Sequence, residues 1–282
     1  MSDVLDRWDP SEYEKNSDFQ YGSAISILKD LPIKSNQKIL DIGCGPGRIT
    51  AALSKRIING KLTGIDVSGK MIRYARKQYG SIENLNFIEM DAQALQFGRY
   101  GLKKIYYDWV ISFWTLSWIK QHEKLISGIT KCLAEKGNIF LLIPLNNPCI
   151  ENTFLELRKE KIWRNYFINY QAPKNDFSPK LYIDLVEKYG FTETSYAYKK
   201  ITKEFPDRES LINFARPWLP YLDPVPDVVR DCFLKTFITS YLARSSYNKN
   251  IIGFDVFTIT ASQMSMVRQK LRNNQLLSYE KI

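Results

Sequence analysis

The stretch Lys38-Ile-Leu-Asp-Ile-Gly-Cys-Gly-Pro-Gly-Arg-Ile-Thr50 decides the fold of this chain of 282 residues. It predicts an apolar strand over 38–42, a turn that carries three glycines, and a helix that begins directly after the turn. The glycines let the backbone turn sharply and approach a ligand closely, because they have no Cβ atom. A strand, a glycine-rich turn and a helix in this order are typical of one nucleotide-binding half of a doubly wound sheet.

A second signal is the acid that closes the next apolar run. Asp66 ends the segment Gly64-Ile65-Asp66-Val67 and follows the glycine-rich turn by about twenty residues. A mononucleotide-binding half places a carboxylate at this position, against the ribose hydroxyls. A carboxylate can accept from both hydroxyls, which a neutral residue cannot match. The alternative is that Asp66 only caps the helix that begins near Ser68.

The spacing of the glycines indicates the kind of ligand. A dinucleotide site needs G-x-G-x-x-G, so that pyrophosphate can lie on the helix N-terminus. Here the series is G-x-G-x-G, and Arg48 occupies the place of the third fingerprint glycine. Asp41 precedes the turn, and a carboxylate at a strand end favours a cationic or ammonium-bearing ligand over a pyrophosphate. The alternative is a turn that serves only as a tight connection.

Apolar strands alternate with helical patterns through the first half of the chain, which predicts an α/β fold with a doubly wound, Rossmann-like sheet. The expected strands are 38–42, 61–66, 85–89, 107–113 and 137–143, and the expected helices between them are 47–58, 69–79 and 120–135. Two further strands over 192–204 and 252–260 bring the mostly parallel sheet to seven strands. A helical stretch over 207–246, broken by prolines, is expected between these two strands as a lid over the strand ends.

The composition is that of an ordinary globular protein, with 44% hydrophobic and 25% charged residues. No run approaches the roughly 18–20 apolar residues of a membrane span, and the N-terminus lacks the apolar core of a secretory signal. The four cysteines show no metal-ligand spacing, so we expect free thiols, no metal site and a cytoplasmic protein. The net charge of +10 suits a nucleic acid, an acidic carrier protein or simply a solvated basic surface.

The motif Asp41-x-Gly-x-Gly-x-Gly, followed by Asp66 and Asp91, resembles the cofactor site of class I S-adenosylmethionine-dependent methyltransferases. The resemblance implies S-adenosylmethionine as cofactor and S-adenosylhomocysteine as its product. It also implies that Asp91 receives the adenine amino group, with capping as the alternative, and that Met71 stacks on the adenine or else belongs to the core. The cofactor-binding residues expected on this basis are Tyr13, Asp41, Gly43, Gly45, Asp66, Val67, Met71, Asp91, Ala92, Ser112 and Phe113.

The pattern of strands and helices and the change of composition after residue 144 divide the chain into four segments. Residues 1–37 are expected to form an N-terminal helical cap, and residues 38–145 the cofactor-binding core. Residues 146–262 carry the substrate-side helices, the last strands and the lid within the same domain. Residues 263–282 form a basic C-terminal extension.

The segment Ser112-Phe-Trp-Thr-Leu-Ser-Trp118 bears on the substrate. Adenine and amide N-methyltransferases carry an Asn/Asp-Pro-Pro-aromatic motif here, and metal-dependent catechol-type transfer would need a cluster of carboxylates; neither is present. The single histidine, His122, is expected at the surface. Phenol and amine methylation often needs a general base, whereas a carboxylic acid is already deprotonated at neutral pH. These absences favour a carboxylate that the site only has to align with the methyl group.

Residues 7 to about 262 are similar, in order, to trans-aconitate methyltransferases and to insect juvenile hormone acid methyltransferases. The similarity lies in Arg7-Trp-Asp-Pro-x-x-Tyr13, Gln20, the glycine-rich turn, Ser112–Trp118 and Leu219-Pro-Tyr-Leu222. Both groups make methyl esters of small carboxylic acids. By that resemblance Gln20 and Trp118 are the catalytic residues that hold the substrate carboxylate, and Tyr13 closes over the cofactor.

The chain departs from the trans-aconitate enzymes at several positions. Phe113 replaces an asparagine, and Ser117 replaces the glutamine or histidine before the tryptophan. Leu219 stands where some of these enzymes have an arginine, and Arg216 is nearby but out of register. These departures favour an acid with an apolar body over a tricarboxylate. For Trp118 and the aromatic residues of the lid, the alternative is core packing.

Two other functions stay open at this stage. Malonyl-acyl-carrier-protein O-methyltransferases share the turn and an aliphatic-x-Trp pattern after the fourth strand, and a basic surface suits an acidic carrier. A nucleic-acid-directed methyltransferase, or a protein that keeps the cofactor without catalysis, is supported only by the net charge. We expect a small acid as substrate and no membrane partner, and the sequence leaves the oligomeric state open.

Overall fold

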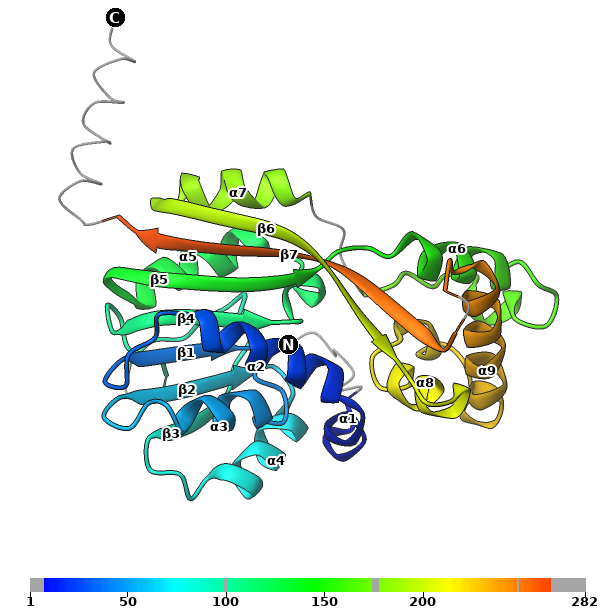
Figure 1. The fold of residues 1–282 in the computed structure, drawn as a ribbon, viewed down its shortest axis with the longest axis horizontal. Helices are drawn as coiled ribbons and strands as arrows, with labels where there is room; N and C mark the ends of the chain where they lie inside the picture. The colour runs from blue at the N-terminus through cyan, green and yellow to red at the C-terminus, as the bar shows by residue number, and fades with distance from the viewer. Residues whose placement is uncertain (1–7, 99–100, 174–177, 248, 265–282) are drawn as a thin grey trace, which may run out of the picture.

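The structure, a computed structural model, describes residues 8–98, 101–173, 178–247 and 249–264. In this part of the chain seven strands form one sheet, in the order β3-β2-β1-β4-β5-β7-β6 (Figure 1). The strands are β1 (Lys38–Ile42), β2 (Lys61–Asp66), β3 (Leu85–Glu89), β4 (Tyr107–Phe113), β5 (Leu133–Pro144), β6 (Phe191–Glu204) and β7 (Ile251–Gln263). The first five run parallel and β7 runs antiparallel to both of its neighbours. This confirms the predicted α/β fold with a mostly parallel sheet.

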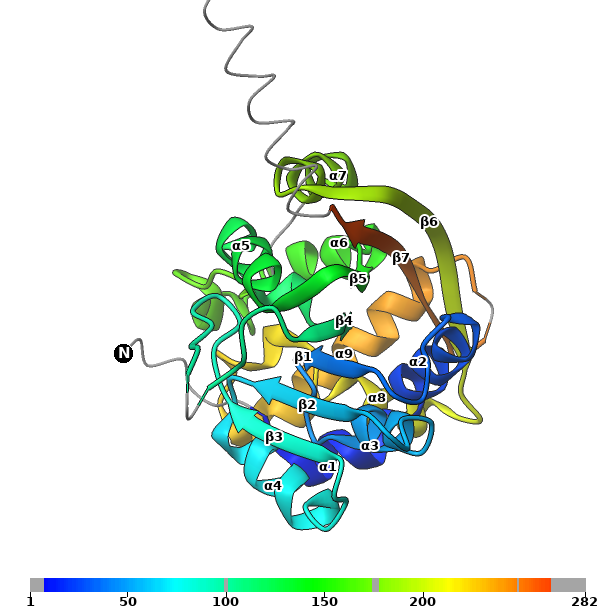
Figure 2. The same cartoon turned by 90° about the vertical axis from the view of Figure 1, so that its left-hand side faces the viewer.

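Helices cover both faces of the sheet, which is why the central strands are buried along most of their length (Figure 2). One face carries α2 (Asp18–Asp30), α3 (Arg48–Ser54) and α4 (Gly69–Tyr79), and the other carries α5 (His122–Cys132) and α7 (Pro179–Lys188). Alternate residues of β1 enter different cores: Ile39 packs toward the first group of helices, and Leu40 and Ile42 toward the second. A sheet covered in this way leaves the strand ends as the place for a ligand.

Two predicted helices end earlier than expected. The helix predicted over 47–58 stops at Ser54, because the backbone N–H groups of Asn59 and Lys61 bond to Ser35 and Gln37 and draw the chain into β2. The helix predicted over 120–135 stops at Cys132, because Leu133 already pairs with Tyr107 and begins β5. The strand predicted over 137–143 is longer at its start for the same reason.

A second group of helices lies beyond the carboxyl ends of the parallel strands (Figure 1). It consists of α6 (Pro148–Leu157), α8 (Arg208–Ala215), the short 3-10 turn η3 (Pro220–Leu222) and α9 (Asp227–Arg244), and we call it the distal helices. Their aromatic side chains pack together within the core that also contains Ile39 of β1, and the rings of Phe154 and Tyr221 stack there at 3.9 Å. The stretch from α8 to α9 lies between β6 and β7, as predicted; its action as a lid stays a prediction.

The N-terminal segment begins with α1 (Pro10–Asn16), whose first turn is capped by the Asp9 carboxylate accepting from the Glu12 N–H at 2.8 Å. Residues 1–7 of the expected cap, Arg7 included, and residues 265–282 of the expected C-terminal extension lie outside the described residues. Among the helices that are described, none is both long and apolar enough to cross a membrane.

Candidate functional site

The glycine-rich turn between β1 and α3 adopts a left-handed backbone at each glycine, with φ of 73° at Gly43, 56° at Gly45 and 85° at Gly47. A Cβ on Gly43 would lie 2.1 Å from Thr115 Oγ1, and one on Gly47 would lie 2.7 Å from the Phe87 ring. A Cβ on Gly45 would meet no protein atom within 4 Å. The turn therefore packs closely against neighbouring side chains at Gly43 and Gly47, and the missing side chain at Gly45 leaves space open beside it.

We expect Gly43→Ala to lower the free energy of unfolding by roughly 2–5 kcal/mol, because it combines a left-handed backbone with steric overlap. The overlap includes the Thr115 Cβ, at 2.6 Å, which no rotation of that side chain removes. Gly45→Ala, a matched control with the same backbone strain and no overlap, should lose only about 1–2 kcal/mol. Urea unfolding measures both; equal losses would contradict the packing described for Gly43.

Asp66, at the end of β2, joins the turn to the next helix. Its Oδ2 accepts from the Gly45 N–H at 2.9 Å, and its Oδ1 accepts from the Ser68 N–H at 2.9 Å. The cap of α4 comes from Ser68, whose Oγ accepts from the Met71 N–H at 3.1 Å. Asp66 is therefore not the helix cap that the alternative interpretation of the sequence assumed.

Asp41 and Ser112 lie behind the glycine-rich turn and are not among the residues that line the cavities beside it. The Asp41 side chain is 2% exposed and accepts from Thr50 Oγ1 at 2.7 Å. Ser112 is fully buried, and its hydroxyl donates to the Ile42 carbonyl at 2.8 Å. With their polar atoms engaged inside the fold, both residues support the turn from beneath.

Burial raises the pKa of Asp41 to about 7; the Thr50 hydrogen bond acts in the opposite sense, and the Asp66 carboxylate adds to the rise. The folded chain then binds this proton more tightly than the unfolded chain, so the stability tied to it is lost as pH rises toward 7. Between pH 5 and pH 8 we expect wild type to lose about 2.5 kcal/mol of unfolding free energy relative to Asp41→Asn. Denaturant unfolding of both proteins across this range tests it; a constant difference would mean that Asp41 is already ionised at pH 5.

A cleft of about 800 Å³, which we call the turn cavity, opens between the glycine-rich turn, α1, α2 and the residues after β4. The predicted site residues that line it are Tyr13, Gln20, Gly43, Gly45, Asp66, Val67, Met71, Phe113 and Trp118. A second opening, the strand-end cavity, adjoins it and shares Asp66, Val67 and Trp118 with it. Asp91 and Ala92 line this second cavity. Residues from several strand ends thus border one continuous site.

At the strand-end cavity the carboxylate of Asp91 already takes part in a local turn. Its Oδ1 accepts from the Gln93 N–H at 2.8 Å. The Gln93 Oε1 in turn accepts from the backbone N–H groups of Lys120 and Gln121, at 3.0 and 2.9 Å. Gln93, which the sequence did not single out, therefore ties the loop after β3 to the segment after Trp118.

Trp8 and the helix α1 cover the turn cavity from the N-terminal side. The Trp8 ring meets Tyr13 edge to face at 5.6 Å and Trp118 at 5.2 Å. Burial, with the Asp66 carboxylate adding to it, raises the pKa of the Tyr13 hydroxyl far above its usual value. Trp8 was part of the quoted N-terminal motif, but its contact with Trp118 has no local signal in the sequence.

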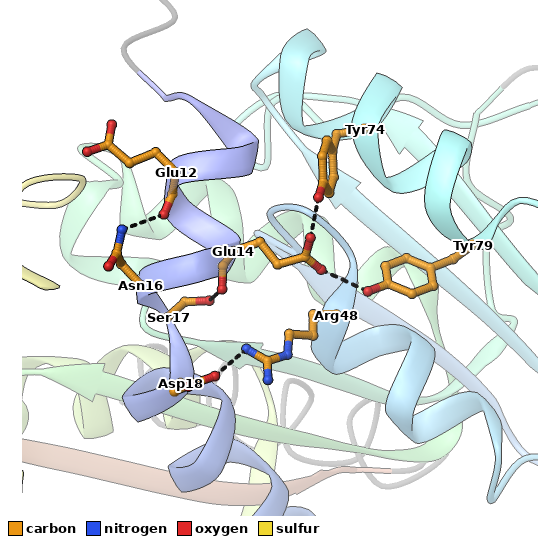
Figure 3. A network of polar contacts seen from close by, with 8 residues as sticks. All are labelled: Glu12, Glu14, Asn16, Ser17, Asp18, Arg48, Tyr74 and Tyr79. Atoms are coloured by element: carbon orange, nitrogen blue, oxygen red, sulfur yellow. Dashed lines mark hydrogen bonds and ion pairs between the residues drawn. The ribbon is translucent and has the colours of Figure 1, made fainter. Parts of the chain in front are cut away.

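The Glu14 carboxylate fastens α1 to α4 (Figure 3). It accepts from the hydroxyl of Tyr79 at 2.9 Å and from that of Tyr74. We call these three residues the Glu14 clasp. Beside it Arg48 bonds Asp18 at 2.7 Å, and its guanidinium lies 4.0 Å from the centre of the Tyr21 ring. Polar side chains thus attach α1 to α4 and α2 to α3.

Arg216, considered at the sequence level as a nearby cation, is engaged elsewhere. Its Nε lies 3.5 Å from Glu12 of α1, and its Nη1 pairs with Asp231 of α9. The guanidinium therefore links α1 to the distal helices. It does not line any of the cavities described here.

Gln20 lies where the turn cavity meets a third cavity of about 400 Å³, which we call the aromatic cavity. The Gln20 side chain is 8% exposed, and its Oε1 has no hydrogen-bond partner among the residues that the structure describes. Beyond it the wall is aromatic, and the rings come from α2, the segment after β4, the distal helices and β7: Phe19, Trp114, Trp118, Trp218 and Phe254. A polar amide thus lies where the turn cavity meets an apolar space.

The described lining of the aromatic cavity includes no His, Asp, Glu, Lys or Cys side chain. In the turn cavity the thiol of Cys44 has its pKa raised well above the usual value by burial, with Asp66 and Asp41 adding to the effect. His122 lies outside the described lining of these cavities. Within the described residues, no group of three or more His, Cys, Asp or Glu side chains comes together as a metal site would require.

Comparison with known proteins gives a consistent result. A family model described as a methyltransferase domain matches residues 39–137. The chain is 30% identical over 236 residues to "Putative methyltransferase 235L" of Invertebrate iridescent virus 6, with 84% of this chain and 86% of that protein covered. It is 24% identical to a trans-aconitate 2-methyltransferase of Acidovorax sp. strain JS42, covering 89% and 94% of the two chains. It is also 24% identical to the juvenile hormone acid O-methyltransferase of Bombyx mori, covering 80% and 83%.

Among solved structures, the chain is similar to a phosphoethanolamine N-methyltransferase 2 of Haemonchus contortus, solved with S-adenosylhomocysteine. The TM-score is 0.60 at 16% identity, with 94% of this chain and 58% of that chain covered. At this identity the match shows similarity of fold alone.

Proposed function

The chain belongs to the class I S-adenosylmethionine-dependent methyltransferases, and from that premise we propose that it forms a methyl ester on a small carboxylic acid. The observation that carries the proposal is the buried Gln20 amide at the edge of an aromatic cavity whose described lining holds no base that titrates near pH 7. A carboxylate needs no such base, because it is already deprotonated. The relatives named as trans-aconitate and juvenile hormone acid methyltransferases support the proposal.

S-adenosylmethionine fits the turn cavity and the strand-end cavity together. Gly45 leaves open the space that a side chain would fill, and Asp66 lines both cavities. In our assignment Asp66 holds the ribose hydroxyls, the turn holds the methionine part, and the adenine lies among Val67, Met71, Asp91 and Ala92. When bound there, the cofactor supplies an electrophilic methyl group on a sulfonium.

The remaining work of the chain is binding and alignment. Gln20 donates its amide N–H to the substrate carboxylate, and Trp118 limits the positions that the carboxylate can take. Holding two reactants in a near-attack geometry supplies a large part of the rate of such a reaction. The aromatic wall keeps water away from the carboxylate, which leaves the Gln20 hydrogen bond without competition.

The test is transfer of a labelled methyl group from S-adenosylmethionine into a panel of small acids and a metabolite extract, followed by mild alkali. We expect label in a small product that alkali releases as methanol. Label that withstands alkali, or that stays in the macromolecular fraction, would overturn the proposal and favour another nucleophile or a carrier-bound substrate.

The Glu14 clasp should matter for cofactor retention, because it holds the helix that carries Tyr13 over the turn cavity. We expect Glu14→Gln to weaken S-adenosylmethionine binding by about 3–10-fold, in line with loss of one to two partly exposed charged hydrogen bonds. Calorimetric titration measures this. Glu123→Gln is the matched control, since Glu123 accepts from Lys188 and Tyr189 between α5 and α7, away from the cavities; equal effects in both variants would contradict the role of the clasp.

A further inference from the structure

Ser117, in the short turn just before Trp118, carries a buried hydroxyl for which the described part of the chain provides no partner. The residue is 5% exposed, and its Oγ has no hydrogen-bond partner among the described residues. The neighbouring Thr115 hydroxyl, by contrast, donates to the Phe113 carbonyl at 3.0 Å. A buried hydroxyl without a partner is unfavourable, so a ligand oxygen that bonds to it removes that penalty.

Ser117 lies at the border between two cavities. It lines the aromatic cavity and also a further cavity of about 460 Å³, the outer cavity, which reaches Glu151 on α6 and Tyr221 of the distal helices. Pro144, Trp218 and Phe254 line both, so the two spaces adjoin at Ser117. Gln20 lines only the inner of the two. A ligand held by Gln20 at its carboxylate would therefore pass along aromatic rings before it reaches Ser117.

The charges along this path exclude a second carboxylate. None of the described residues that line the aromatic and outer cavities is Lys, Arg or His, and the outer cavity contains the acid Glu151. Arg216 is paired with Glu12 and Asp231. A second ionised carboxylate would lose its hydration here without gaining a cation, which is costly. A neutral oxygen can bond to the hydroxyl of Ser117 at no such cost.

We propose that Ser117 determines specificity by binding a neutral hydroxyl or carbonyl oxygen in the otherwise apolar body of a monocarboxylic acid. This inference rests on the proposed carboxyl methylation. It goes further by assigning a second polar contact point on the substrate and by excluding acids with two or three carboxylates. A site built to bond a substrate oxygen discriminates against the analogue that lacks it more strongly than an apolar pocket discriminates by size.

The test compares kcat/KM for straight-chain C8–C12 monocarboxylic acids, for the same acids carrying one hydroxyl at each successive carbon, and for the dicarboxylic acids of equal length. In wild type we expect one hydroxyl position to exceed the plain acid by about tenfold or more, and the dicarboxylic acids to react least. In Ser117→Ala this ratio should fall to near one, and Ser117→Thr, which keeps a hydroxyl, should retain part of it.

The ratio of two substrates on the same variant is insensitive to a general loss of folded enzyme, and Ser54→Ala is the matched control. Ser54 is a buried serine whose hydroxyl donates to the Ala51 carbonyl at 2.7 Å, outside the described cavities. Its loss should leave the substrate ratio as in wild type. Acids that are methylated without preference for a hydroxyl, or a preference that survives in Ser117→Ala, would overturn the role of Ser117 and leave the proposed function standing. Failure to methylate any acid would overturn both.

Discussion

Replacing Gln20 by alanine is expected to lower kcat/KM for methyl transfer by about 100-fold or more. The buried amide faces both the turn cavity and the aromatic cavity, and loss of a hydrogen bond to a charged group costs about 1.5–3 kcal/mol. Misalignment of the carboxylate adds to this loss. Initial rates with labelled S-adenosylmethionine at varied acid concentration measure the effect.

Two comparisons separate a role in alignment from a loss of folding. Binding of S-adenosylmethionine to Gln20→Ala should stay within about threefold of wild type, because Gln20 lies at the substrate end of the site. Gln37→Ala is a matched control: its Oε1 accepts from the Lys34 N–H at 2.8 Å in an exposed loop far along the sheet. Turnover of Gln20→Ala within threefold of wild type would remove Gln20 from the site.

Replacing Asp66 by asparagine is expected to weaken S-adenosylmethionine binding by about 100- to 1,000-fold. Two charged hydrogen bonds to ribose hydroxyls are together worth about 3–4 kcal/mol, and each 1.4 kcal/mol is a factor of ten. The asparagine side chain would also place an N–H group where a carboxylate oxygen of Asp66 now accepts from the backbone N–H of Gly45 or Ser68. Calorimetric titration with the cofactor measures the change.

The control for Asp66 is Asp108→Asn. Asp108 also accepts from a backbone N–H, that of Lys38 at 2.7 Å, but at the start of β1 and away from the cavities. It should alter stability without altering cofactor affinity. The cofactor affinity of Asp91→Asn should lie between those of the other two variants, about tenfold below wild type. Asp91 is exposed and already accepts from Gln93. Equal affinities in Asp66→Asn and Asp108→Asn would exclude Asp66 as the ribose ligand.

The fold could be predicted because its signals are local. The glycine-rich turn and the alternation of apolar strands with helical patterns determine β1 to β4 nearly to the residue, as at Lys38–Ile42 and Tyr107–Phe113. The end of α5 could not be predicted, since it depends on Leu133 pairing with Tyr107. That contact joins residues far apart in the sequence.

Within the site, the sequence found the acids at the strand ends but not which way they point. Asp41 and Asp66 look alike as terminal acids of two strands, yet only Asp66 lines the cavities, because Thr50 engages Asp41 inside the fold. Arg48 was seen only as a missing glycine, although it bonds Asp18 of α2. The Glu14 clasp depends on three-dimensional neighbours and leaves no pattern in the chain. The same holds for the Ser117 hydroxyl, which has no hydrogen-bond partner within the described ranges.

The most direct test of the central claim compares four compounds that share one body: an acid that the enzyme accepts, its primary alcohol, its amide and its amine. Each is incubated with the enzyme and labelled S-adenosylmethionine, and the product is then treated with mild alkali. We expect label only in the acid, all of it released as methanol, because the described lining of the aromatic cavity includes no base for the other three compounds. Transfer to the alcohol, the amide or the amine at a rate comparable with the acid would contradict it.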